Sequence, residues 1–85
     1  MKHATTVALD KLEPLLAKLR QLPGLKERSR GIFYVKSRAF LHFHEDAAGL
    51  FADIRAADGG DFDRINVDAP EARAALYERA RASLA

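Results

Sequence analysis

Cysteine is absent from this chain of 85 residues, and the net charge is only +2. Without thiols there can be no disulfide, thiolate zinc site, iron–sulfur cluster or cysteine nucleophile. The small net charge excludes a polybasic tail, and a hydrophobic content of 48% argues against disorder. No stretch approaches the roughly 20 apolar residues of a membrane helix, and the first residues lack an apolar run of signal-peptide length. We therefore expect a cytoplasmic protein with no membrane partner.

The length indicates a single domain over residues 1–85. Typical domains hold roughly 100–150 residues, and chains of about 60 residues can already fold alone. One hydrophobic core is therefore possible and two are not. Because no disulfide can hold the chain together, side-chain packing must stabilise the fold.

The leucines between positions 9 and 22 recur every three or four residues, which predicts an amphipathic helix. Its start has two alternatives. The helix begins either at Asp10, which opens a capping box and puts Pro14 in the first turn, or at Thr5 or Thr6 with a kink near Pro14. Pro23-Gly24 ends it in either case.

A second helix is predicted at the end of the sequence. Asp68 is a favourable N-cap, Pro70 suits the first turn, and Glu71 completes the capping box. A narrow apolar stripe then continues along one side of the helix: Ala69, Ala72, Leu76, Ala80 and Leu84.

Four runs rich in β-branched and aromatic residues predict strands at 31–36, 39–44, 50–55 and 62–67. Residues 25–30 are interpreted as a basic loop, and 45–49 as the loop of a hairpin. Short connections between successive strands require an antiparallel meander. The predicted fold is therefore α+β in the order αββββα: a four-stranded antiparallel meander sheet with the N- and C-terminal helices packed on one face.

Side chains alternate along a strand, so the two faces of this sheet can be separated. We expect Phe43 to pair with Leu50, and Leu41 with Ala52. The predicted core face comprises Leu41, Phe43, Leu50, Ala52, Ile54, Ile65 and Val67. Phe33 and Val35 join this face if the turn between the first two strands holds three residues. The other face, which two helices cannot also cover, carries Tyr34, Lys36, Phe40, His42, His44, Phe51, Asp53, Arg55, Phe62, Arg64 and Asn66.

His42 and His44 form a His-x-His pattern, so both rings leave the same side of one strand. Asp53 on the next strand is the natural third ligand, and imidazole with carboxylate suits zinc, iron or manganese. A pair of His42 with Asp53 could also serve general acid–base chemistry. Partly exposed strand histidines that bind no ion explain the same pattern. We therefore predict no catalytic residue and no cofactor, and keep these three residues as candidate metal ligands.

The uncovered face mixes aromatic and charged side chains, which predicts a binding surface. An apolar surface patch commonly contacts a partner, and most often a second copy. We therefore expect a non-enzymatic interaction module that forms a homodimer through this face or its edge. The alternatives are stacking of single-stranded nucleic acid on the aromatics, at about 1–3 kcal/mol per base, and a metal or small-ligand site. The candidate binding residues are Tyr34, Phe40, His42, His44, Phe51, Asp53 and Arg55.

The segments Leu22–Leu25, Gly31–Asp46 and Gly49–Arg55 resemble a small bacterial family of uncharacterised proteins, and the similarity extends from residue 15 to the end. This resemblance implies an arrangement of elements and no activity. The arrangement is also loosely similar to frataxin-like and YjbR-like domains. Frataxins hold iron at an acidic ridge on the first helix, whereas the first helix here mixes acidic and basic residues, so no iron site is implied.

Overall fold

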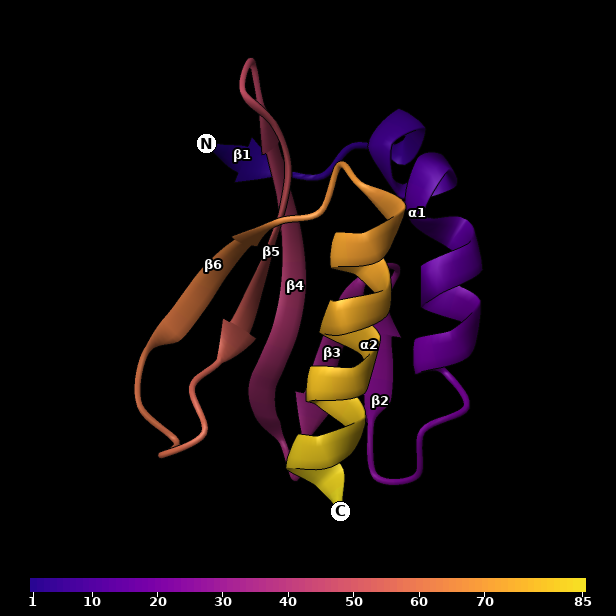
Figure 1. Ribbon diagram of the computed structural model, residues 1–85. Coiled ribbons are helices and arrows are strands. Elements are labelled where there is room, and N and C mark those ends of the chain that lie inside the picture. Colours follow the sequence, from indigo (N-terminus) through magenta and orange to yellow (C-terminus); the bar gives the residue numbers. More distant parts are fainter.

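In the computed structural model, which describes residues 1–85, two helices cover one face of an antiparallel sheet (Figure 1). The α+β class and the position of both helices agree with the prediction, but the sheet has six strands rather than four. None of the helices has the length and apolar content needed to cross a membrane. The elements are β1 (Lys2–His3), α1 (Thr6–Leu19), β2 (Lys26–Ser29), β3 (Ile32–Val35), β4 (Arg38–Asp46), β5 (Gly49–Arg55), β6 (Phe62–Asn66) and α2 (Pro70–Leu84).

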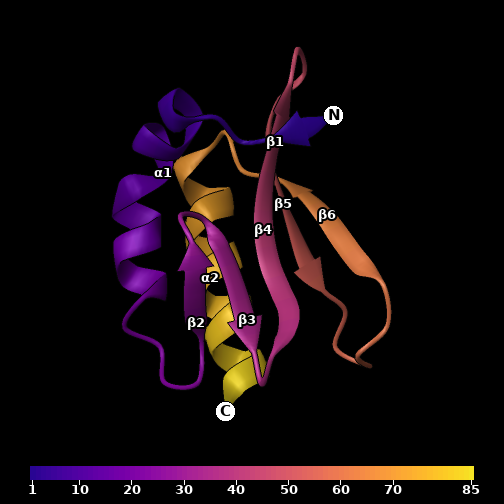
Figure 2. The same ribbon diagram turned by 180° about the vertical axis from the view of Figure 1, so that it is seen from behind.

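The strands lie in the order β2-β3-β4-β5-β6, and β1 pairs with β4 outside this path. β3 pairs with residues 38–42 of β4, whereas β1 pairs with residues 44–45. β5 occupies the opposite edge of β4, so β1 and β3 lie one after the other along the same edge. Figure 2 shows β1 beside β4 at the end of the sheet away from the β3–β4 turn. This arrangement brings the start of the chain to the centre of the sheet.

β2 forms where the sequence predicted a basic loop, so that prediction is wrong. Three of its four residues are exposed, and no hydrophobic alternation marks it as a strand. It is held by backbone pairing to β3 across the Arg30-Gly31 turn, in which Gly31 has a φ of +79° that favours glycine. An edge strand of this kind has the composition of a loop.

The core lies between the helices and the sheet and contains 18 buried hydrophobic residues. The leucine stripe of α1 supplies much of it, whereas α2 contributes Leu76 and Ala80. Most of the predicted core face is buried, including Phe33, Leu41, Phe43, Leu50, Ala52, Ile54 and Val67.

The predicted register between β4 and β5 is wrong by two residues. Phe43 pairs with Ala52, and Leu41 pairs with Ile54. The reason is the turn, which is formed by Ala47 and Ala48 alone because β4 extends to Asp46 and β5 begins at Gly49. A shift of two residues leaves each side chain on its predicted face.

Phe40 does not lie on the uncovered face, contrary to the prediction. A β-bulge interrupts the pairing of β3 and β4, because Phe33 pairs with Leu41 and Tyr34 pairs with Ala39. Phe40 is the additional residue, and its side chain is 8% exposed and belongs to the core. A bulge redirects a side chain in this way, and strict alternation cannot anticipate it.

α1 begins at Thr6, the earlier of the two alternatives, with Pro14 inside the helix. The Glu45 carboxylate holds this end by accepting hydrogen bonds from the Thr5 backbone N–H and hydroxyl at 2.7 and 2.8 Å. The helix ends at Leu19, and the chain continues in a tight turn to Leu22, where the sequence placed the helix end.

The capping role predicted for Asp68 is not present, because its carboxylate has a partner elsewhere. No side chain caps α2, whose N-cap residue is Ala69. Asp68 Oδ1 accepts the Leu50 N–H at 3.0 Å, and Oδ2 accepts the Asn66 amide at 3.0 Å. Asp68 therefore joins the start of β5 to the connection between β6 and α2.

Candidate metal centre

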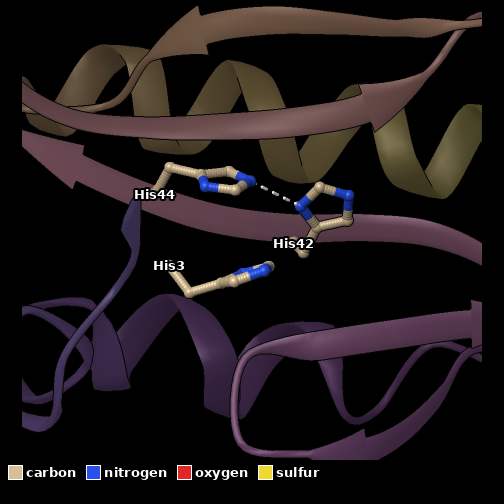
Figure 3. Close-up of side chains that lie close together, drawn as sticks. All are labelled: His3, His42 and His44. Atoms are coloured by element: carbon tan, nitrogen blue, oxygen red, sulfur yellow. Dashed lines mark hydrogen bonds between the residues drawn. The ribbon is translucent and has the colours of Figure 1, made fainter. Parts of the chain in front are cut away.

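Three histidines meet on the face of the sheet that the helices leave uncovered (Figure 3). They are all the histidines of the chain. His42 and His44 lie two residues apart in β4 and so point to the same side, and His3 lies opposite His44 because β1 pairs with β4. The ring centroids of His3 and His44 are 4.7 Å apart, and those of His42 and His44 are 5.0 Å apart.

The ring nitrogens converge closely enough to share one ion. One nitrogen from each ring lies within 4.8 Å of the others. His42 Nδ1 and His44 Nε2 are 3.0 Å apart (Figure 3). Zinc binds imidazole nitrogen at about 2.0–2.1 Å, so two such ligands on a tetrahedral ion are about 3.3 Å apart. These two rings therefore need only a small adjustment, and the exposed His3 has the freedom to complete the set.

Asp53 lies next to the histidines and is held firmly. It pairs with His42 across β4 and β5 and is 6% exposed. Its carboxylate accepts two hydrogen bonds from Arg64 on β6, both of 2.7 Å, and its Oδ2 is 3.3 Å from His44 Nε2. The predicted third ligand is thus beside the cluster, but His3 is the third member of the group of converging nitrogens.

The environment favours the neutral form of His42 and His44. Burial lowers the pKa of His42, and the neighbouring His44 lowers it further. Burial also lowers the pKa of His44, against the opposing effect of Asp53. The hydrogen bonds from Arg64 hold the pKa of Asp53 below its usual value, so this carboxylate stays ionised. A metal ion binds the neutral imidazole, and here protons compete with it weakly.

One nitrogen of the cluster is without a partner. His44 Nδ1 is buried and makes no hydrogen bond, although the Lys2 carbonyl lies close enough to raise the pKa of the ring. A buried polar atom without a partner is uncommon and costs about 1–3 kcal/mol. A metal bound through Nε2 would leave the ring proton on Nδ1, and ligating histidines usually donate that proton to a carbonyl or carboxylate.

Two of the other predicted site residues lie at separate places on this face. Tyr34 packs against Arg28, whose guanidinium carbon is 4.7 Å from the ring centroid. Arg55 donates hydrogen bonds to the carbonyls of Ala39 and Gly60 and stacks over Phe62. Neither residue belongs to the group of converging nitrogens.

Three further residues lie next to the cluster, and only one of them was a candidate binding residue. That residue is Phe51 on β5, which pairs with His44 on β4. Phe62 and Arg64 were placed on the face but given no role, and Phe62 lies 4.7 Å from the His42 ring, centroid to centroid. His3 was missed because two polar residues give no strand signal. The one indication in the sequence was that His3 is the only histidine besides the His42 and His44 pair.

The stability of the metal-free protein is expected to fall as the pH drops below about 6.5. His42 and His44 have lowered pKa values in the folded state, so near pH 6 the unfolded chain, with histidines of pKa about 6.5, binds more protons. Urea unfolding in buffer without metal should give a constant free energy of unfolding above pH 7.5 and a decline toward pH 5. The double variant His42→Gln/His44→Gln should lack this decline. A decline equal to that of the unsubstituted chain would show that other groups cause it.

Comparison with protein-family models, with curated proteins and with solved structures finds no match for this chain. The similarity to frataxin-like and YjbR-like domains therefore stays an expectation from the sequence. The function has to be inferred from the geometry of the histidine cluster and its surroundings.

Proposed function

We propose that this chain binds one divalent transition-metal ion through His3, His42 and His44. The observation that carries the proposal is the convergence of three imidazole nitrogens, from two strands distant in sequence, within 4.8 Å of one another. The lowered pKa values of His42 and His44, which favour the neutral form that a metal binds, and the buried Nδ1 of His44 without a hydrogen bond support it.

Zinc fits this set of ligands best. Imidazole suits zinc, copper, nickel and iron, and three histidines bind zinc tetrahedrally with a fourth position left for water or a carboxylate. Asp53 provides negative charge beside His44, and Arg64 orients that carboxylate. The proposal is one of binding and includes no reaction.

Two features of the face favour a metal over the other proposed occupants. The large hydrophobic residues that are strongly exposed are Met1 and Val7, so the aromatics of this face offer little free apolar area to a second copy. Two aromatic rings already carry cations, Arg28 over Tyr34 and Arg55 over Phe62. A stacked base would have to displace these guanidinium groups.

Calorimetric titration of the tag-free protein with Zn²⁺ tests the proposal. We expect one bound ion per chain. Substituting a residue that only supports a metal ligand already lowers metal affinity about tenfold to a hundredfold. His42→Gln and His44→Gln, which remove ligands, should therefore lower the affinity for Zn²⁺ at least about a hundredfold. His3→Gln should also weaken binding, which identifies the role of β1. Zn²⁺ is used as the probe instead of Cu²⁺, because backbone nitrogens beside His3 can bind Cu²⁺ without His42 and His44.

The matched control is Asp63→Asn, which removes a carboxylate of β6 that pairs with Arg79 and is not part of the cluster. Its affinity for Zn²⁺ should equal that of the unsubstituted chain. No binding by the unsubstituted chain, or equal binding by the His42 and His44 variants, would refute the proposal.

A further inference from the structure

A cleft of about 640 Å³ opens where three segments meet: the β3–β4 turn, the loop after β5 and the last turns of α2. Figures 1 and 2 both show these segments at the end of the molecule where α2 ends. None of the histidines lines this cleft. Its volume lies in the range of small-molecule sites, about 300–1,000 Å³. The cleft is therefore separate from the candidate metal centre.

The floor of the cleft is apolar. The β-bulge in β4 turns Phe40 away from the uncovered face, and this side chain lines the cleft together with Val35 and Ala39. On the opposite wall, α2 contributes the small residues Ala82 and Ser83, which leave room above the floor. The β-bulge that interrupts the alternation of side chains in β4 therefore places the aromatic ring of Phe40 in the cleft.

The charged residues that line the cleft are all arginines: Arg38, Arg55 and Arg79. Arg79 pairs with Asp63 outside the cleft lining. Arg55 donates through Nε and Nη1 to the backbone carbonyls of Ala39 and Gly60, so its position is fixed while Nη2 is not used in these bonds. Arg38 makes no ion pair or side-chain hydrogen bond. The cleft therefore carries positive charge that the protein itself does not neutralise.

We propose that this cleft binds a small organic carboxylate, with its head at Arg38 and Arg55 and its apolar body over Phe40 and Val35. Guanidinium groups bind carboxylates through charge-assisted hydrogen bonds, and a preorganised arginine loses less entropy on binding. The apolar floor requires a ligand with a hydrocarbon part, which inorganic anions lack. Since the cleft shares no residue with the histidine cluster, this proposal does not depend on the metal.

NMR titration of the full chain with octanoate tests this second site. We expect saturable shifts of backbone amides in the cleft, with Ala56 and Ala82 among them. Octanol, which has the same body without the charge, should bind at least about tenfold more weakly, because it cannot form the charge-assisted hydrogen bonds to the arginines. Acetate, which has the charge without the body, should also bind at least about tenfold more weakly, because it has no methylene groups to bury over the apolar floor. Absence of saturable shifts with octanoate, or equal binding of octanol, would overturn the proposal.

Arg38→Gln should weaken octanoate binding about tenfold or more. The matched control is Arg81→Gln, because Arg81 lies on α2, pairs with Glu78 and does not line the cleft. Ala82→Leu provides a second variant, which should weaken binding by filling the space for the apolar body. Equal affinity in Arg38→Gln and Arg81→Gln would show that the cleft does not recognise the carboxylate.

Discussion

Gly49→Ala is expected to lower the free energy of unfolding by about 3 kcal/mol or more. Gly49 has a φ of +132°, and a β-carbon at this position would overlap Asp68 Oδ2 and lie 2.8 Å from Asp68 Cγ. Backbone strain of this kind costs about 1–3 kcal/mol. Displacement of Asp68 also leaves the Leu50 N–H at the start of β5 without its acceptor. The loss of this hydrogen bond destabilises the fold by about a further 1–3 kcal/mol. Urea unfolding followed by circular dichroism measures the change.

Gly24→Ala is the matched control for this substitution. Gly24 also has a positive φ, of +86°, but a β-carbon there would meet no atom within 4 Å. We expect a loss of about 1–2 kcal/mol from backbone strain alone. Equal losses in the two variants would show that Asp68 does not join β5 to α2 in the way described.

Zn²⁺ at one hundred times its dissociation constant is expected to stabilise the folded protein by about 2.7 kcal/mol. The ligands come from β1 and β4, which are brought together only in the folded chain, so the ion binds this state preferentially. For a domain of this size the gain corresponds to a rise in Tm of about 10–20 °C. Thermal unfolding with and without Zn²⁺ measures it.

The double variant His42→Gln/His44→Gln serves as the control for the metal effect. It should unfold at the same temperature in the presence and absence of Zn²⁺. If Zn²⁺ raises the Tm of this variant as much as that of the unsubstituted chain, the ion binds elsewhere.

The face of the sheet that carries the histidines was predictable, and the reason is the alternation of strands. Leu41 and Phe43 mark the buried side of β4, so His42 and His44 had to lie on the other side. The error of two residues in the register with β5 did not matter, because Asp53 stays on the same face after such a shift.

The third histidine was not predictable, because its position depends on a contact between residues far apart in the sequence. His3 lies in a strand of two exposed residues, and it reaches His44 through the pairing of β1 with β4. β2 was missed for a related reason, since its polar residues are indistinguishable from those of a loop. Backbone pairing stabilises both strands, and it leaves no hydrophobic signal.

Two local predictions failed because tertiary contacts outweighed local preference. Aspartate is a favourable N-cap residue, but the carboxylate of Asp68 accepts hydrogen bonds from the Leu50 N–H and the Asn66 amide instead. Phe40 follows the alternation of polar-face residues, but the bulge opposite Phe33 turns it into the core. Neither event can be inferred from neighbouring residues alone.

Histidine-selective NMR of the zinc-loaded protein tests the central claim most directly, because the three histidines of the chain all belong to the proposed site. We predict that one equivalent of Zn²⁺ changes the imidazole nitrogen shifts of all three rings together, with coordination through Nδ1 of His42 and Nε2 of His44, the two atoms that face one another. Unchanged imidazole signals, or a change confined to His3, would contradict a shared metal site on this sheet.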